Sequence, residues 1–241
     1  MVDSAADVRE FIWRGRTGPF TLQLGPDVFA PSSTSTIVAE SLEINAGDVV
    51  IDAGCGSGVL AFVAAKLGAE RAVGCDISEE SVRMATENAR RLRLDHLTEF
   101  RTGSLLEPVR DIKADVVIGD ISGIPDPIAE LTGWFPEGRG GGPTGAELPV
   151  AMLDEIGDVL RAGGRMYLPT GSIQAESKVL AAARRVFGDD IERLVEREFP
   201  LPNLVARSKD VARLVSDGLI SFRQRGSRLL WRLTVWRCIK K

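Results

Sequence analysis

The sequence predicts an α/β fold in which a doubly wound, mostly parallel sheet carries helices on both faces. Short apolar runs typical of buried strands alternate along the chain with amphipathic segments typical of helices. A glycine-rich turn at residues 54–58 also lies directly between the first buried run, Val49–Asp52, and a helical pattern. In such folds, ligands bind where the strands end, so we expect the functional residues there.

Composition fits one folded α/β domain with an extension. The chain has 241 residues, 44% of them hydrophobic, and a formal net charge of −4. This charge gives no overall attraction to nucleic acid or to an anionic membrane. No run approaches the roughly 20 apolar residues of a membrane helix, and the first residues do not resemble a signal peptide. We therefore expect a cytoplasmic protein with no nucleic-acid or membrane partner, and we leave a homodimer open.

Metal and thiol chemistry are not expected. The chain has three cysteines without a CxxC pair and a single histidine. A zinc site or a Ser-His-Asp triad needs more ligands or partners than these residues supply. We interpret Cys55, Cys75 and Cys238 as buried free thiols.

Residues 1–45 are predicted to form an N-terminal extension that covers the active site, and residues 46–241 to form the core. Apolar positions in residues 3–13 suit a short helix, and Phe20–Leu24 alternates like a strand before a turn. Ser32 begins a run of good N-cap residues. The expected order in the extension is therefore helix, short hairpin and helix.

Within the core, later strands and helices follow from the same patterns. Residues 133–145 hold six glycines and two prolines and are interpreted as a loop. Residues 219–222 and 228–239 are expected to pair as a C-terminal hairpin. The other expected strands are Arg71–Asp76, Leu97–Thr102, Ala114–Ile118 and Arg165–Leu168, and the expected helices begin near Val59, Ser78, Val150 and Ala175.

Several candidate ligand-binding residues follow predicted strands. They are the glycine turn, Asp76, Ser104 and Asp120. Because parallel strands end at the same edge of a sheet, residues distant in sequence should converge there. Asp76 lies 18 residues beyond Gly58, where a carboxylate accepts hydrogen bonds from both hydroxyls of a ribose.

The glycine spacing separates two cofactor classes. A dinucleotide fingerprint reads G-x-G-x-x-G, whereas here the order is G-x-G-x-G, with Val59 in place of the third fingerprint glycine. The chain also has one tyrosine and no Tyr-x-x-x-Lys pair. An NAD-type oxidoreductase is thus the less favoured alternative.

The stretch Asp52–Gly58, together with Asp76, resembles the cofactor site of class I S-adenosylmethionine-dependent methyltransferases. This resemblance implies a Rossmann-like, seven-stranded sheet with an antiparallel last strand, and S-adenosyl-L-methionine as cofactor. It implies methyl transfer to a nitrogen or oxygen. The residues expected to bind the cofactor are Asp52, Gly54, Cys55, Gly56, Gly58, Asp76, Ile77, Ser104, Leu105 and Asp120.

Within that class, about 200 residues resemble the methyltransferases that modify glutamine in release factors. The similar segments are Phe29–Ser35, Gly141–Gly145 and Gly171–Gln174. That group carries Asn-Pro-Pro-Tyr after the fourth strand, where this chain reads Asp120-Ile121-Ser122-Gly123. The stacking tyrosine is absent, so a small-molecule or protein amine, guanidine, hydroxyl or carboxylate becomes a better acceptor than glutamine or a base.

On this basis we assign Asp120 a catalytic role, either as a base or in orienting the acceptor. Ser35, Ile121 and Ser122 are assigned to the acceptor. Because the acceptor motif is degenerate, a non-catalytic methyltransferase-like binding protein stays open as another alternative.

The place of Asp76 gives the first prediction. Substituting Asp76→Ala should weaken binding of S-adenosylhomocysteine by about 1.5–3 kcal/mol, because a charge-assisted hydrogen bond to the ribose is lost. Isothermal titration calorimetry measures this change directly. Unchanged affinity in the variant would reject the assignment.

Overall fold

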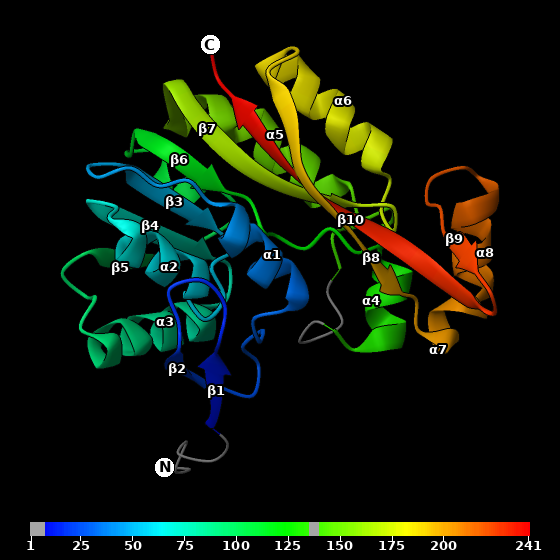
Figure 1. The fold of residues 1–241 in the computed structure, drawn as a ribbon, viewed down its shortest axis with the longest axis horizontal. Helices are drawn as coiled ribbons and strands as arrows, with labels where there is room; N and C mark the ends of the chain where they lie inside the picture. Colours follow the sequence, from blue (N-terminus) through cyan, green and yellow to red (C-terminus); the bar gives the residue numbers. More distant parts are fainter. Residues whose placement is uncertain (1–7, 135–139) are drawn as a thin grey trace.

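The fold is built around one twisted sheet (Figure 1). The computed structural model describes residues 8–134 and 140–241. The strands lie in the order β5-β4-β3-β6-β7-β10-β8, with a short β9 paired to β10. β10 runs antiparallel to both neighbours, as the resemblance implied. The bounds are β3 Val49–Ala53, β4 Arg71–Asp76, β5 Thr98–Thr102, β6 Ala114–Ile118, β7 Leu160–Gly171, β8 Ile191–Pro200, β9 Arg223–Arg225 and β10 Arg228–Ile239.

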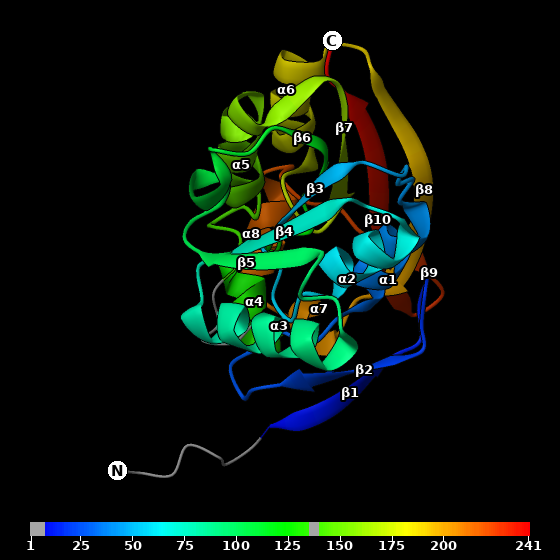
Figure 2. The same cartoon turned by 90° about the vertical axis from the view of Figure 1, so that its left-hand side faces the viewer.

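Helices cover both faces of this sheet, which confirms the predicted fold class (Figure 2). Successive residues of a strand point to opposite faces, and alternate strand residues accordingly pack in different clusters. Val50 belongs to the cluster with α1 and α2, whereas Ile51 belongs to the cluster with α5 and α6. The helices are α1 Ser33–Ser41, α2 Val59–Leu67, α3 Glu79–Leu92, α5 Glu147–Val159 and α6 Glu176–Phe187, with a 3-10 turn at Glu107–Val109.

The start of the described chain differs from the sequence-based expectation. Arg9–Trp13 is strand β1, paired antiparallel with β2, Phe20–Leu24, and is not part of a helix. Residues 3–7 of the expected helix lie outside the described residues. Pairing sets Trp13 opposite Phe20, and both rings are buried. The hairpin therefore gains from long-range burial that the helical spacing of apolar residues did not reveal.

A buried asparagine fastens this hairpin to the core. Asn88, on α3, accepts from the backbone N–H of Gln23 at 2.7 Å. Its amide donates to the carbonyls of Gln23 at 3.0 Å and Ser57 at 3.3 Å. One side chain thus connects α3, β2 and the glycine turn, and it is fully buried.

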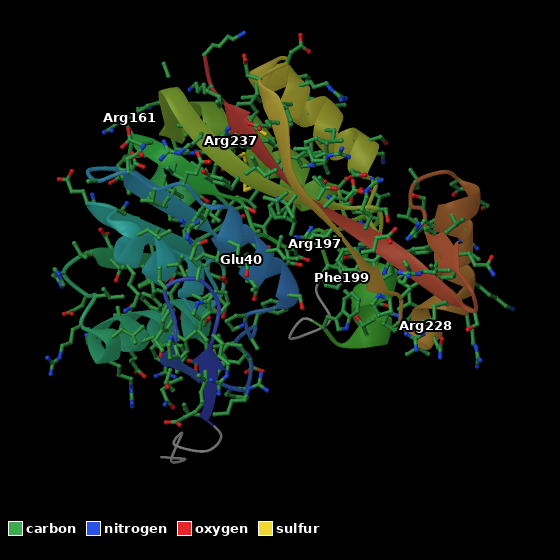
Figure 3. The ribbon with its side chains drawn as sticks, viewed as in Figure 1. Glu40, Arg161, Arg197, Phe199, Arg228 and Arg237 are labelled. Atoms are coloured by element: carbon green, nitrogen blue, oxygen red, sulfur yellow. The ribbon has the colours of Figure 1, made fainter. Side chains whose placement is uncertain are left out.

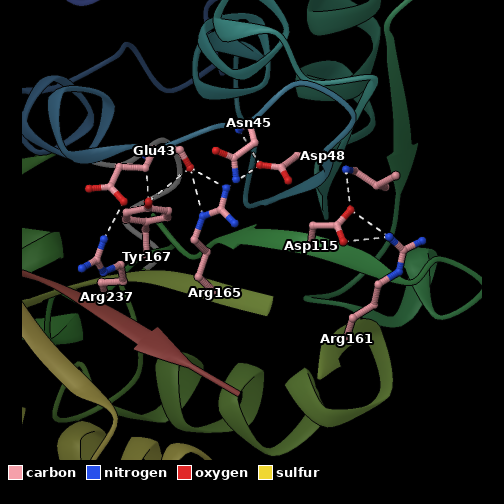
Figure 4. Close-up of polar contacts among 9 residues, drawn as sticks. Glu43, Asn45, Asp48, Asp115, Arg161, Arg165, Tyr167 and Arg237 are labelled. Atoms are coloured by element: carbon pink, nitrogen blue, oxygen red, sulfur yellow. Dashed lines mark hydrogen bonds and ion pairs between the residues drawn. The ribbon is translucent and has the colours of Figure 1, made fainter. Parts of the chain in front are cut away.

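A network of polar contacts anchors the chain just before β3 (Figure 4). Arg165 on β7 donates to the carbonyl oxygen of Glu43 and pairs with Asp48. The hydroxyl of Tyr167 accepts from the N–H of Glu43 at 2.8 Å. Asp115, at the start of β6, accepts from the N–H of Val49 at 2.9 Å. These contacts fix the edge of the sheet where β3 and β6 begin.

A small lobe lies beside the N-terminal half of β10 (Figure 1). It contains α4 Asp126–Thr132, α7 Asn203–Ala206 and α8 Lys209–Ser216, with its own apolar cluster around Ile128, Val205 and Val211. The expected C-terminal hairpin is shorter than predicted, because residues 219–222 are not a strand and β9 spans three residues. Ile220 is instead buried in the lobe. None of the described helices is long and apolar enough to cross a membrane.

The connection made by Asn88 gives a prediction for stability. Asn88→Ala should lower the free energy of unfolding by about 1–3 kcal/mol, because it leaves the Gln23 backbone groups without partners. Urea denaturation followed by circular dichroism measures the loss. Asn203→Ala, at an exposed asparagine, is the matched control and should change stability by less than about 0.5 kcal/mol. Equal effects of the two substitutions would contradict the role of Asn88.

Candidate functional site

A cavity of about 670 Å³ opens at the edge of the sheet where β3, β4 and β6 end. The predicted convergence is therefore present, because residues from all three strand ends line it. The sequence-predicted residues in its lining are Ser35, Asp52, Gly54, Cys55, Gly56, Asp76, Ile77, Ser104, Leu105, Asp120, Ile121 and Ser122.

The glycine turn forms the floor of this cavity. The N–H groups of Gly54 and Cys55 both donate to the carbonyl of Cys75, at 2.8 and 3.0 Å, so the turn is held against the end of β4. Gly56 has a φ of 50°, which favours glycine. A Cβ there would meet nothing nearer than the carbonyl oxygen of Phe29 at 3.8 Å. Gly56 thus keeps open a space into which a side chain would project.

Gly58 was predicted to bind the cofactor but does not line the cavity. It is the N-cap of α2, with a φ of 85°. A Cβ at Gly58 would lie 2.8 Å from the ring of Phe62 and 3.0 Å from that of Phe100. The absence of a side chain at Gly58 is therefore explained by packing beneath the turn.

Asp76 is fixed in place by backbone groups on both sides. One carboxylate oxygen accepts from the N–H of Gly56 and the other from the N–H of Ser78, both at 2.9 Å. Each oxygen of a carboxylate has a second lone pair. Asp76 can therefore hold the glycine turn and still accept hydrogen bonds from ligand hydroxyls.

Asp52 lies buried under the turn. One oxygen accepts from the N–H of Ala61 at 3.0 Å, whereas Oδ1 has no hydrogen-bond partner in the part of the chain that the structure describes. Burial raises the pKa of Asp52 well above its ordinary value, the negative charge of Asp120 raises it further, and the bond from Ala61 opposes both. The site thus contains a carboxyl group with an unused acceptor atom.

Asp120 follows β6 and lies beside the glycine turn, since a Cβ at Gly54 would come within 2.9 Å of the side chain of Ile121. It also contacts the N-terminal extension. The hydroxyl of Ser35, in the first turn of α1, donates to Asp120 Oδ2 at 2.9 Å. Burial raises the pKa of Asp120 to about 6, although the bond from Ser35 opposes that shift. Ser32 caps α1 through the N–H groups of Thr34 and Ser35, so the helix start that carries Ser35 is well defined.

The other end of the cavity comes from segments that the sequence did not mark as a site. It is lined by Trp231 and Leu233 on β10 and by residues at and just after the end of β7, namely Pro169, Thr170, Gly171, Ile173 and Gln174. The ring of Trp231 stacks on Phe199 with centroids 5.2 Å apart. Figure 3 shows Phe199 on the half of β8 that runs toward the lobe. Trp231 and Leu233 belong to a strand with no local motif, so only sheet pairing places them here.

The lining carries one sign of charge. Four aspartates line the cavity, and the described lining residues include no lysine, arginine or histidine. The sequence-based prediction missed the fourth, Asp27. Clefts lined by one sign of charge attract ligands of the opposite sign. Cys55 and Cys75 also line the cavity as free, buried thiols, and no group of three metal-ligating side chains occurs among the described residues.

The known sequences to which this chain is similar include methyltransferases. The family model for ribosomal protein L11 methyltransferase (PrmA) matches residues 33–136, which is less than half of the chain. The ribosomal protein L11 methyltransferase of Syntrophomonas wolfei is 31% identical over 124 residues, covering 52% of this chain and 33% of that protein. The Listeria monocytogenes protein of the same name is 29% identical over 167 residues, covering 69% and 46%. The chain thus spans less than half the length of these curated relatives.

Solved structures agree on the fold. A ribosomal protein L11 methylase from Lactobacillus delbrueckii aligns with a TM-score of 0.52 and 20% identity, covering 86% of this chain and 78% of that one. The 16S rRNA N2 G1207 methyltransferase (RsmC) of T. thermophilus, solved with AdoMet and guanosine, aligns with a TM-score of 0.61 and 15% identity, covering 98% and 51%. The chain therefore has the class I methyltransferase fold. The finer resemblance to the release-factor group finds no support in these matches.

The open space above Gly56 gives a prediction for binding. Gly56→Val should abolish binding of S-adenosylhomocysteine while the far-ultraviolet circular dichroism stays native. Gly47→Val is the matched control: Gly47 also has a positive φ, of 89°, and a Cβ there would meet nothing within 4 Å, but Gly47 does not line the cavity. Both variants carry backbone strain, so loss of binding in both, or in neither, would refute the role given to Gly56.

Proposed function

We propose that this chain transfers the methyl group of S-adenosylmethionine to an amine nitrogen of a protein acceptor, of the kind named by its relatives, ribosomal protein L11. The observation that carries this proposal is the cavity itself. It joins a glycine turn, a carboxylate fixed at the end of β4 and a second carboxylate at the end of β6, with no cationic side chain in its described lining. The similarity to L11 methyltransferases supports the choice of acceptor.

The residues present fit the cofactor. Gly56 leaves room above the turn, and Asp76 has free lone pairs for a ribose diol. Oδ1 of Asp52 is a buried oxygen without a partner in the described chain, which suits a site completed by a ligand. S-adenosylmethionine supplies a methyl sulfonium, an electrophilic carbon with a positive charge beside it. The ionised aspartates of the lining would stabilise that charge.

Asp120 acts on the acceptor in this proposal. An ammonium group has no lone pair, so the acceptor nitrogen would have to lose a proton before it could take the methyl group. With a pKa of about 6, Asp120 is mostly ionised at pH 7, attracts the ammonium and accepts its proton more readily than an ordinary aspartate. The Ser35 hydroxyl holds the carboxylate in position.

The acceptor end of the cavity suits an amine on an apolar stem. Ile124, Ile173 and Leu233 line this end, together with Trp231. Such walls bury the methylene groups of a long side chain while Asp120 meets its charged head. A carboxylate or phosphate acceptor would instead meet four aspartates without a compensating cation, which disfavours those classes.

Methylation of recombinant ribosomal protein L11, followed by intact-mass spectrometry, tests the proposal. Asp120→Ala should bind S-adenosylhomocysteine within a few fold of the native protein, whereas turnover at saturation should fall about 10²-fold or more. Asp120→Asn keeps an acceptor oxygen but takes no proton. Near-native turnover of that variant would indicate orientation alone. Cofactor binding without transfer to any amine would favour the non-catalytic alternative.

The raised pKa of Asp120 also predicts a pH dependence. Turnover at saturating cofactor should fall as the pH drops through about 6, because protonation removes both the charge and the proton-accepting oxygen. In the Asp120→Asn variant, this limb of the pH profile should disappear. A native profile that is flat from pH 5 to 8 would contradict the role of Asp120.

A further inference from the structure

The polar side chain of Gln174 is buried at the acceptor end of the cavity, against the loop that follows Asp120. Gln174 follows β7 and is 4% exposed. Its carboxamide packs against the loop that follows Asp120, since a Cβ at Gly123 would come within 2.4 Å of Gln174 Oε1. The glycine at position 123 thus makes room for this amide beside the acceptor loop.

Two buried polar atoms at this end have no partners. Nε2 of Gln174 and Oγ of Ser122 make no hydrogen bond within residues 8–134 and 140–241. A buried donor left unpaired costs about 1–3 kcal/mol, and such groups in native proteins need an explanation. The nearby side chains of Ile124, Ile173 and Trp231 are apolar and offer no partner, so a ligand bound in the cavity can supply one.

The chemistry of that partner can be narrowed. A carboxamide N–H donates, so the ligand must offer an acceptor atom. An anionic acceptor is disfavoured by the aspartates and by the lack of cations in the described lining. A neutral carbonyl oxygen satisfies both conditions. The terminal torsion of glutamine is broad, so the amide can turn its N–H toward the cavity without breaking any hydrogen bond seen in the described structure.

We propose that Gln174 is an acceptor-positioning residue whose carboxamide donates to a peptide carbonyl of the methyl acceptor. This inference rests on the proposed function. It adds that the site distinguishes an amine carried on a peptide from a free alkylamine. Asp120 recognises the amine, and Gln174 recognises the backbone or terminal amide that accompanies it.

A binding experiment tests this without requiring turnover. Calorimetry in the presence of S-adenosylhomocysteine compares three probes: butylamine, Nα-acetyl-lysine N-methylamide and alanine N-methylamide. The native protein should bind one of the two amide probes about three- to tenfold more tightly than butylamine, the effect of one neutral hydrogen bond. Preference for the lysine probe indicates a side-chain amine, and preference for the alanine probe indicates a terminal amine.

Gln174→Met should remove this preference and leave affinity for S-adenosylhomocysteine within about twofold. Gln224→Met is the matched control, because Gln224 is exposed on β9 and does not line the cavity. Gln174→Glu, which lacks the N–H donors but keeps the shape, should also lose the preference and serves if the methionine variant does not fold.

The proposal is overturned if the native protein binds the three probes equally or binds none of them. It is also overturned if either folded Gln174 variant keeps the native preference. Failure of the proposed function looks different, since the probes would then bind with the expected preference although no acceptor is methylated.

Discussion

The burial of carboxylates at one edge of the sheet is the constraint on which the site depends. Asp52 is buried and Asp120 is half-buried, and the loss of hydration raises the pKa of each. Neither has a cationic partner in the described lining. The compensation comes from an N–H of α2 for Asp52 and from a hydroxyl of α1 for Asp120. Such a site favours the arrival of positive charge, since a cation relieves the desolvated carboxylates.

At the opposite edge of the sheet, where the strands begin, the acidic side chains are paired with arginines. Asp48 and Asp115, where β3 and β6 begin, pair with Arg165 and Arg161. These aspartates also accept hydrogen bonds from backbone N–H groups near the start of β3. Their charges are balanced within the chain. The same sheet therefore has one edge whose acidic groups are internally paired and one whose acidic groups are left for a ligand.

The two ends of the cavity also differ in how the chain builds them. The end that we propose for the cofactor comes from segments close in sequence, the glycine turn and the end of β4, which backbone hydrogen bonds hold together. The end that we propose for the acceptor combines the loop after β6, the end of β7, β10 and the first turn of α1. Because four separate segments meet there, its shape depends on sheet order and on the packing of the lobe against β10.

Local sequence was enough to predict the strand–turn–helix unit, the cap of α1 by Ser32 and the carboxylates at strand ends. These follow from local physics: burial of apolar strands, glycine at positive φ and side-chain capping of N–H groups. The N-terminal strand, the role of Gly58 and the place of Trp231 were decided by tertiary packing. Arg9–Trp13 is a strand because Trp13 is buried opposite Phe20, Gly58 serves packing against two phenylalanines, and Trp231 reaches the cavity through strand pairing. The burial of Trp13 in the cluster with α1 and α2, the contact of Gly58 with Phe100 and the pairing of β10 with β8 involve residues far apart in the chain, and no local pattern encodes them.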